Sequence, residues 1–193
     1  MELNYYFPTV IGRSYEHKLR DKLFPIVKKI LTDEDLLTNP WGYANTYRGP
    51  HKKGLERFPE FEEFSNFLVK KSYEYLKQIG YKPLVKLKPN IFASGIGYGE
   101  FHGRHCHPMT TLTGVFYLDC PEGSSDCIFY DSRTFHDSRT TLLPVENDKH
   151  SQRQFSIPAE NGLFLMWESW LHHEVPVNKS ISPRTTLVFH MRD

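Results

Sequence analysis

The 193-residue chain has few cysteines and no long apolar run. Its three cysteines, Cys106, Cys120 and Cys127, are an odd number without CxxC spacing, which excludes a disulfide framework and a thiolate zinc knuckle. No apolar run approaches the length of a membrane span, and the N-terminal segment lacks a hydrophobic stretch of signal-peptide length. We therefore expect a soluble, cytoplasmic protein from a reducing compartment.

The chain also lacks an excess of charge of either sign. It has 24 Lys and Arg residues against 23 Asp and Glu residues. This balance argues against general binding to nucleic acid or to a membrane surface. Aromatic residues, in contrast, make up 15% of the chain. Together with many short apolar runs, they favour a β-rich core.

The length suits a single domain, residues 1–193, with a substantial core. Residues 1–80 predict an N-terminal helical layer. A short strand over residues 4–12 precedes a helix that Ser14 is placed to cap and that Pro25 weakens or splits. A second helix is predicted from Pro59 to Ile79, where acidic residues fill the first turn and a glycine follows the last.

From residue 81 onward, short strand-like runs alternate with turn residues. This pattern is typical of an antiparallel sandwich or barrel, so residues 81–193 predict a jelly-roll core. The predicted strands are 84–87, 90–96, 113–119, 127–130, 155–157, 162–167 and 185–190.

Two polar stretches are predicted to be long loops. Residues 33–57 contain Trp41, Tyr43 and Tyr47, which either cover an edge of the core or contribute to a substrate lid. Residues 131–153 are long for a connection, so we expect them to form a loop at the barrel mouth.

A histidine-rich segment, His102 to Pro108, is the main chemical feature of the sequence. If it is a strand, His105 and His107 point to the same face, because side chains two apart share a face. Neutral imidazole is a common metal ligand, and a third ligand would come from His172 or His173. The alternative is that these histidines lie on the surface or form ordinary hydrogen bonds.

A second feature, Arg184 with Thr186, follows some ten residues after the histidine pair. On a strand the two side chains share a face and offer a fork of N–H donors and a hydroxyl. This combination suits a carboxylate ligand. The alternative is an arginine paired with a structural aspartate or glutamate.

These segments resemble the Fe(II)- and 2-oxoglutarate-dependent dioxygenases, whose core is a double-stranded β-helix, a cupin-like jelly roll. The closer resemblance is to a subgroup of 2OG-Fe(II) oxygenases from bacteria and phages with a His-x-His-Pro motif. The matching stretches are His105-Cys-His107-Pro108, Leu112-Thr-Gly-Val-Phe-Tyr117, Phe129-Tyr-Asp131-Ser-Arg133, Trp167-Glu-Ser-Trp-Leu-His-His173-Glu-Val175 and Arg184-Thr-Thr-Leu-Val-Phe189.

The resemblance implies that His105, His107 and His173 bind Fe(II), with the neighbouring His172 outside the ligand set. It also implies that Arg184 binds the distal carboxylate of 2-oxoglutarate.

Further pocket candidates follow from their positions. Thr186 and Tyr98 are the other expected contacts of 2-oxoglutarate. Asp131, Arg133 and His172 are candidates for supporting roles around the site, although Asp131 and Arg133 could equally be an ion pair that fixes a turn.

One position departs from the larger superfamily, which has Asp or Glu where this chain has His107. A face of three histidines supplies no negative charge, so we expect iron binding to depend on the anionic 2-oxoglutarate. A carboxylate such as Asp131 or Glu100 could alternatively complete the site. His102 is expected at the rim of the site.

The implied activity is oxidation, usually hydroxylation, of a small-molecule or peptide substrate with release of succinate and CO2. The sequence does not identify this substrate. It also leaves the oligomeric state open, with a homodimer as one option. The alternative is a metal-binding cupin-like protein without 2-oxoglutarate turnover.

Overall fold

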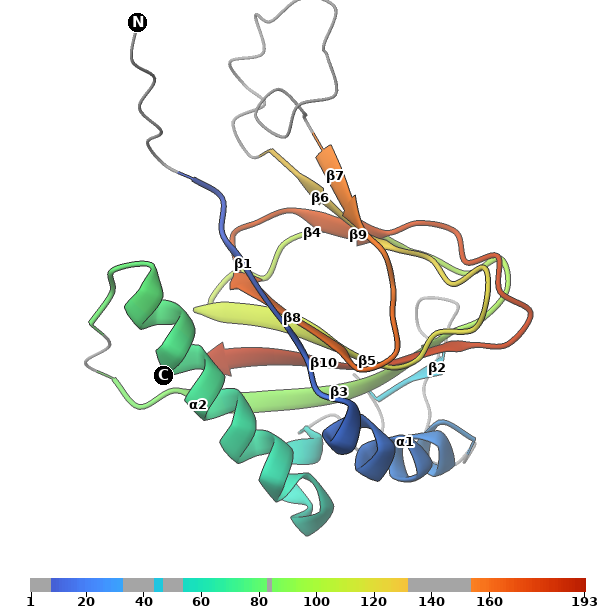
Figure 1. Ribbon diagram of the computed structural model, residues 1–193, viewed down its shortest axis with the longest axis horizontal. Helices are drawn as coiled ribbons and strands as arrows, with labels where there is room; N and C mark the ends of the chain where they lie inside the picture. Colours follow the sequence, from blue (N-terminus) through green and yellow to red (C-terminus); the bar gives the residue numbers. More distant parts are fainter. Residues whose placement is uncertain (1–7, 33–43, 47–53, 83–84, 132–153) are drawn as a thin grey trace, which may run out of the picture.

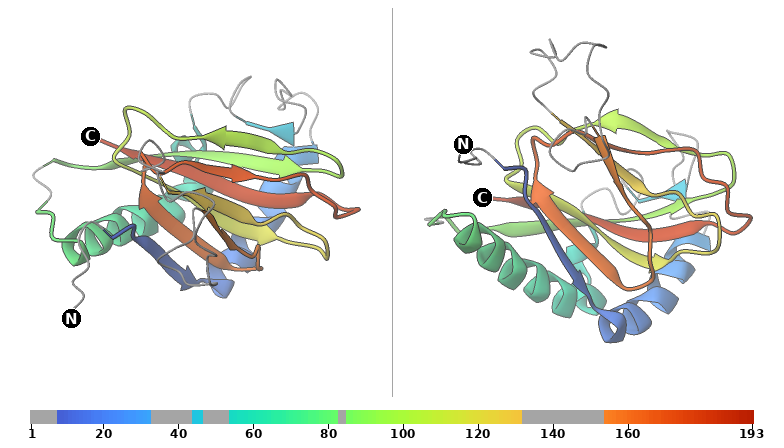
Figure 2. Two further views of the ribbon diagram at one scale, coloured as in Figure 1. Left: turned by 90° about the horizontal axis from the view of Figure 1, so that it is seen from above. Right: turned by 45° about the horizontal axis from the view of Figure 1, so that its top comes forward.

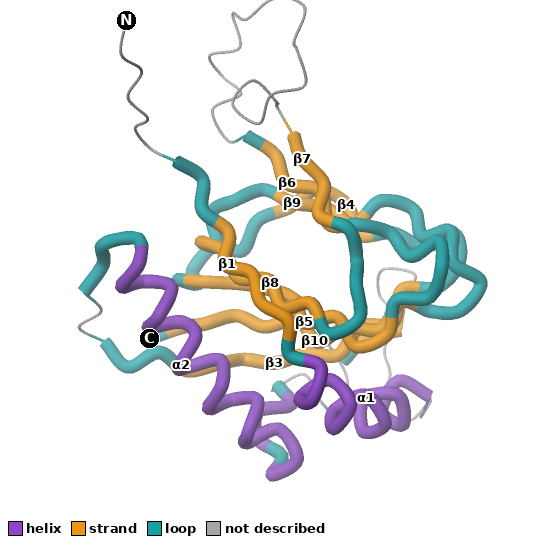
Figure 3. Tube along the Cα trace, viewed as in Figure 1, coloured by secondary structure: helices purple, strands orange, loops and turns teal. Residues whose placement is uncertain are grey.

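The computed structural model describes residues 8–32, 44–46, 54–82, 85–131 and 154–193. It consists of three layers: a small sheet, a large sheet and two helices (Figures 1 and 3). Both sheets are antiparallel. The large sheet has the order β1-β8-β5-β10-β3-β2 and the small sheet the order β4-β9-β6-β7. From β3 onward the chain passes repeatedly from one sheet to the other, as in a jelly roll.

The strands of the large sheet are β1 (Ile11–Tyr15), β2 (Ala44–Asn45), β3 (Lys88–Ile96), β5 (Leu112–Asp119), β8 (Leu163–Glu168) and β10 (Arg184–Arg192). Those of the small sheet are β4 (His102–His105), β6 (Cys127–Tyr130), β7 (Gln154–Ile157) and β9 (His173–Val175). The predicted fold class, a mainly β jelly roll with N-terminal helices, is confirmed.

The helices α1 (His17–Thr32) and α2 (Glu62–Gln78) cover the face of the large sheet that points away from the small sheet (Figures 1 and 2). Two 3-10 turns, η3 (Leu55–Arg57) and η4 (Pro59–Phe61), precede α2. Val27 and Phe64 from the helices pack with Phe116 and Phe189 from the sheet in one apolar core. A second core lies between the two sheets. No helix in the described residues is long and apolar enough to span a membrane.

The helix predictions are confirmed in part. The second helix lies where it was expected, with its first turn in 3-10 geometry and Gly80 following at a φ of 90°. Ser14, in contrast, does not cap α1, because it belongs to β1 and pairs with Phe164. Pro25 does not split α1. It lies on the exposed side of the helix, where water can replace the backbone hydrogen bond that the missing N–H would have made.

The strand predictions were wrong mainly at the sheet edges. Residues 85–87 are not in a strand. Within residues 1–80, β1 and β2 join opposite edges of the large sheet, so this region is not purely helical. The short strand β9 was not predicted, and β4 was considered only as a possible strand in the histidine-rich segment. Of the predicted loop 33–57, the structure shows β2 and the turn that begins at Gly54; Trp41, Tyr43 and Tyr47 lie outside the described residues.

Candidate active site

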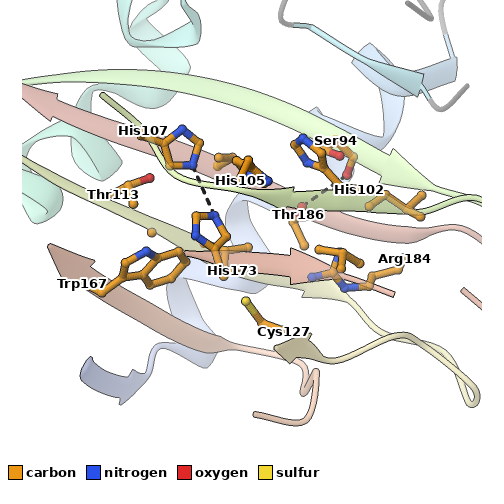
Figure 4. A pocket seen from close by; sticks show the side chains of 15 residues that line it. Ser94, His102, His105, His107, Thr113, Cys127, Trp167, His173, Arg184 and Thr186 are labelled. Atoms are coloured by element: carbon orange, nitrogen blue, oxygen red, sulfur yellow. Dashed lines mark hydrogen bonds between the residues drawn. The ribbon is translucent and has the colours of Figure 1, made fainter. Parts of the chain in front are cut away.

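A pocket with about 470 Å³ of free space, part of it open to solvent, lies between the two sheets. Figure 4 shows its two polar groups of side chains: His105, His107 and His173 lie on one side, and Arg184 and Thr186 on the other. The apolar side chains of Val115 and Val188 also line the pocket.

The histidine triad is assembled by the pairing of β4 with β9. His105 ends β4 and is the pairing partner of His173, the first residue of β9. His107 follows β4, where its backbone N–H donates to the Ser169 carbonyl at 2.9 Å. One ring nitrogen from each of the three histidines lies within 4.8 Å of the others, and Nε2 of His107 is 3.3 Å from Nε2 of His173. Three nitrogen atoms therefore converge on one point.

For two of the three triad rings, hydrogen bonds determine which nitrogen carries the proton and which keeps a free lone pair. Nδ1 of His105 lies 2.7 Å from the Gly103 carbonyl, and Nδ1 of His173 lies 2.9 Å from the Leu171 carbonyl. A carbonyl only accepts, so both rings carry their proton on Nδ1. Their Nε2 lone pairs remain free, which is the usual arrangement of a metal-binding histidine.

The triad is uncharged at neutral pH. Burial lowers the pKa of His173 to about 3 and also lowers the pKa values of His105 and His107. Burial raises the pKa of the nearby Cys127 thiol to about 12, so this pocket residue remains a neutral thiol. The metal-binding chemistry of the triad is thus that of three neutral imidazoles.

Arg184 is the buried charge of the pocket, with 2% of its surface exposed. No ion pair in the described part of the chain involves it, and its Nε has no hydrogen-bond partner there. Its guanidinium carbon lies 4.8 Å from the ring centre of Tyr117, a fully buried residue. The Tyr117 hydroxyl also lacks a partner among the described residues, and burial raises its pKa, so it keeps a proton to donate.

Strand register places these donors together. Thr186 of β10 pairs with Tyr117 of β5 on one side and with Ser94 of β3 on the other. The Thr186 hydroxyl lies 3.5 Å from the Ser94 carbonyl, too far for a strong hydrogen bond, so it is available to a ligand. Arg184 lies two residues away on the same strand. Donors that lack partners in a buried pocket are suited to an anion.

A family model described as "Putative 2OG-Fe(II) oxygenase" matches residues 93–190, just over half of the chain. The chain belongs to this family of 2OG-Fe(II) oxygenases. It is therefore an oxidoreductase with Fe(II) and 2-oxoglutarate as its cofactors. No curated protein matches it in sequence.

Solved structures support the fold of the oxygenase. A prolyl-4-hydroxylase from Pseudomonas putida is 11% identical, with 95% of this chain and 92% of that chain covered and a TM-score of 0.65. A prolyl hydroxylase from Trichoplax adhaerens, solved with a peptide of hypoxia-inducible factor, is 12% identical over 95% and 83%, also at 0.65. AviO1 from Streptomyces viridochromogenes Tue57 is 12% identical over 96% and 90%, again at 0.65.

Tyr98 is not placed to bind 2-oxoglutarate in the oxygenase. It lies in the turn after β3 with 74% of its surface exposed and does not line the pocket. Gly97 and Gly99 flank it, and Gly99 has a φ of 79°, so the chain turns away from the sheet before the residue can point inward. The buried hydroxyl next to Arg184 belongs instead to Tyr117.

The supporting candidates that the structure describes do not line the pocket. His172 is half-buried and does not line the pocket. Asp131 follows β6 and is likewise outside the pocket lining, and Arg133 falls outside the described residues. The Glu100 carboxylate accepts a hydrogen bond from the Gly97 N–H at 2.5 Å and so belongs to a turn. Within the described residues, no carboxylate joins the metal-ligand cluster.

Sequence reasoning underestimated His102 and missed His190. His102, expected at the rim, is half-buried, lines the pocket and stacks on His105 with ring centres 4.1 Å apart. The buried His190 lies 4.3 Å from His107, ring centre to ring centre. Counting in steps of two along β10 from Arg184 reaches His190 and could have found it.

Proposed function

We propose that His105, His107 and His173 bind Fe(II) and that Arg184, together with Tyr117 and Thr186, binds the distal carboxylate of 2-oxoglutarate. The observation that carries this proposal is the buried guanidinium of Arg184, which forms no ion pair with any described residue and lies in the same pocket as the histidine triad. On this basis the oxygenase hydroxylates an unactivated C–H bond of its substrate.

The state of Arg184 supports a carboxylate ligand for energetic reasons. A buried charge without a partner costs several kcal/mol, and the described residues supply no partner for this one. A carboxylate can accept two parallel N–H bonds from a guanidinium. The phenol of Tyr117 can donate a further hydrogen bond to the same group.

The rest of the pocket fits a short dicarboxylate that reaches from Arg184 toward the triad. Along β10, Val188 follows Thr186 by two residues, about 7 Å at the rise of a strand. Val188 and the neighbouring Val115 provide an apolar surface for methylene groups. A molecule of five carbons can therefore be held by one carboxylate at Arg184 while its 2-oxo acid group lies near the histidines.

The donor set of the triad also fits the metal. Three neutral imidazoles on one face suit a divalent first-row metal and leave other positions open for ligands. When bound, Fe(II) supplies the redox chemistry that converts 2-oxoglutarate and dioxygen to succinate, CO2 and an oxidised substrate. The protein holds the ligands in place, and the apolar walls around Val115 and Trp167 limit access of water.

The substrate is proposed only as a class. Two structural neighbours are prolyl hydroxylases, one of them bound to a peptide, and another neighbour is an epimerase of nogalamycin biosynthesis. A peptide or a small molecule is therefore the substrate class we propose. We also infer a cytoplasmic location, because the three cysteines are free, as they would be in a reducing compartment.

Succinate release without an added substrate tests the proposal. Iron-loaded protein is incubated with 2-oxoglutarate and oxygen, and succinate is measured over time. We expect slow turnover in the wild type and turnover at least tenfold slower in Arg184→Ala. The substitution removes a charge-assisted interaction with the carboxylate of about 1.5–3 kcal/mol.

Tyr98→Phe is the matched control, since its hydroxyl lies in an exposed turn outside the pocket, and it should turn over like the wild type. No turnover by the wild type would favour a metal-binding jelly roll without oxygenase activity. Unchanged turnover in Arg184→Ala would refute the assigned carboxylate site.

A further inference from the structure

A row of three side chains on the large sheet, Trp167, Thr113 and His190, lies against the triad, and the function proposed above gives no role to Thr113 or His190. Thr113 of β5 pairs with Trp167 of β8 on one side and with His190 of β10 on the other. The Trp167 ring meets His173 edge-on at 4.8 Å, and the His190 ring lies 4.3 Å from His107. The row therefore contacts two of the three proposed metal ligands.

The direction of two hydrogen bonds fixes the tautomer of His190. The Thr113 hydroxyl donates to the Phe189 carbonyl at 3.0 Å, because a carbonyl only accepts. A hydroxyl has a single proton, so the same oxygen must accept the second hydrogen bond, which joins it to Nδ1 of His190 at 3.0 Å. His190 thus carries its proton on Nδ1, and its Nε2 keeps an unprotonated lone pair.

His107 is the one triad ring without such an anchor. Its backbone is fixed, because its N–H donates to Ser169 and its carbonyl accepts from Thr110. Its Nε2 is the atom that approaches His173, so binding metal through Nε2 requires a proton on Nδ1. No hydrogen bond in the described part of the chain involves Nδ1 of His107, whereas His105 and His173 both donate from Nδ1 to a carbonyl.

Three histidine rings lie close to His107, and only one of them is available as an acceptor. His105 and His173 use their Nε2 lone pairs for the metal in the proposed site. His190 is held by Thr113 and has a free Nε2. A metal-binding histidine nearly always donates its second N–H to an acceptor, which fixes the ring and raises its basicity.

We propose that His190 is a positioning residue: when His107 binds the metal through Nε2, Nε2 of the adjacent His190 accepts the Nδ1 proton of His107 and so holds this ligand in place. Thr113 acts one step further away by keeping the proton of His190 on Nδ1. The inference rests on the proposed metal site, because it assigns a role only if His107 is a ligand. It assigns to a neutral histidine the orienting role that carbonyl groups have for the other two ligands.

Titration of the full-length, metal-free protein with Co(II), a redox-stable probe for this site, tests the inference. His190→Phe keeps an aromatic ring without an acceptor, and Thr113→Val keeps the volume without the hydroxyl. We expect Co(II) to bind about 10- to 100-fold more weakly to His190→Phe and about tenfold more weakly to Thr113→Val. The visible absorption of bound Co(II), which reports ligand geometry, should change in both variants.

Two further variants separate orientation from packing. In His190→Gln, a side-chain oxygen can accept from His107 while the amide N–H₂ donates to Thr113, so Co(II) affinity should stay within about threefold of wild type. Thr185→Val makes the same substitution as Thr113→Val at another buried threonine of the large sheet, one that does not line the pocket. It should leave both affinity and absorption unchanged.

His107→Ala distinguishes failure of the inference from failure of the proposed site. If His107→Ala loses Co(II) binding while His190→Phe binds like wild type, the metal site stands and the role of His190 is refuted. If His107→Ala binds like wild type, the proposed site itself is refuted. Should His190→Phe fail to fold, the comparison of Thr113→Val with Thr185→Val decides, and equal affinities there refute the inference.

Discussion

At the residue scale, the proposed carboxylate site combines the charge of Arg184 with the phenol of Tyr117, a residue that the sequence analysis did not propose for this role. Tyr117 is fully buried beside Arg184 and keeps its proton because burial raises its pKa. We expect Tyr117→Phe to raise the KM for 2-oxoglutarate about tenfold, the size expected for one hydrogen bond to a charged group, with a smaller change in kcat. Succinate formation measured against 2-oxoglutarate concentration gives both constants. A KM equal to that of the wild type would show that Tyr117 does not bind the carboxylate.

The histidines of the pocket also predict how the metal-free protein responds to acid. Burial lowers the pKa of His173 to about 3 and that of His190 to about 4, against about 6.5 in an unfolded chain. Between these values the unfolded state binds more protons than the folded state, so stability is lost as the pH falls from 6.5 toward 4. Each histidine contributes a slope of up to about 1.4 kcal/mol per pH unit.

Urea unfolding of the metal-free protein at several pH values measures this loss. The midpoint should fall steadily below pH 6.5, and His190→Gln should make the profile shallower because one titrating group is gone. A profile that is flat between pH 7 and pH 5 would contradict the assignment of these buried, neutral rings.

The structure brings together the metal-site candidates that the sequence offered, but the sequence did not predict what surrounds them. The spacing of His105 and His107 and the position of Arg184 could be read from the sequence, and the structure brings all three residues into one pocket. The spacing from Arg184 could have found His190, but the roles of Tyr117 and His190 could not be assigned from the sequence, because they depend on which residues of neighbouring strands lie opposite them. That register is a property of the sheet, set by the pairing of β5 with β10.

At the scale of elements, the close packing of β5 at the centre of the large sheet requires a glycine at position 114. A Cβ at Gly114 would lie 2.1 Å from the Leu165 carbonyl and 2.3 Å from the ring of Phe189, and the backbone of β8 cannot move without losing its pairing with β5. We expect Gly114→Ala to lower the free energy of unfolding by about 2 kcal/mol or more, as in other overpacked cores.

Gly103→Ala in β4 is the matched control for this substitution, because a Cβ there meets nothing within 4 Å. Its unfolding free energy should stay within about 0.5 kcal/mol of wild type. Denaturant unfolding of the two variants side by side makes the comparison. Equal stability of Gly114→Ala and Gly103→Ala would contradict the packing argument.

The elements that the sequence predicted well are those with a strong periodic signal. The apolar stripe of α2 and the long central strands β3, β5 and β10 were located to within a few residues. The edge strands β1 and β2 and the inner strand β9 were not, because they are short and their pairing partners are far away in sequence. Such strands are stabilised by their neighbours in the sheet rather than by local preference.

At the scale of the whole molecule, the two sheets contribute different parts of the site. The small sheet and the residues that follow β4 supply the proposed metal ligands, whereas Arg184 and Thr186 come from the large sheet. Metal and 2-oxoglutarate bound together would therefore connect the two sheets across the pocket. Binding of each should influence the other through the structure as well as through charge.

Charge is the main reason to expect that Fe(II) and 2-oxoglutarate strengthen each other's binding to the oxygenase. The three metal ligands are neutral, the described residues place no carboxylate among them, and Arg184 adds a positive charge to the same pocket. A bound divalent cation is therefore not neutralised until the dianionic 2-oxoglutarate joins it. We expect Fe(II) to bind at least about tenfold more tightly with saturating 2-oxoglutarate than without it, a coupling free energy of about 1.4 kcal/mol.

Anaerobic Fe(II) titrations with and without 2-oxoglutarate measure the coupling. By linkage, Fe(II) must tighten 2-oxoglutarate binding by the same factor, which provides an internal check. His107→Asp places a negative charge among the ligands, so it should bind Fe(II) more tightly in the absence of 2-oxoglutarate and show weaker coupling. Equal Fe(II) affinities under both conditions in the wild type would contradict the argument, because a site of three neutral imidazoles beside a guanidinium has no other source of compensating charge in the part of the chain that the structure describes.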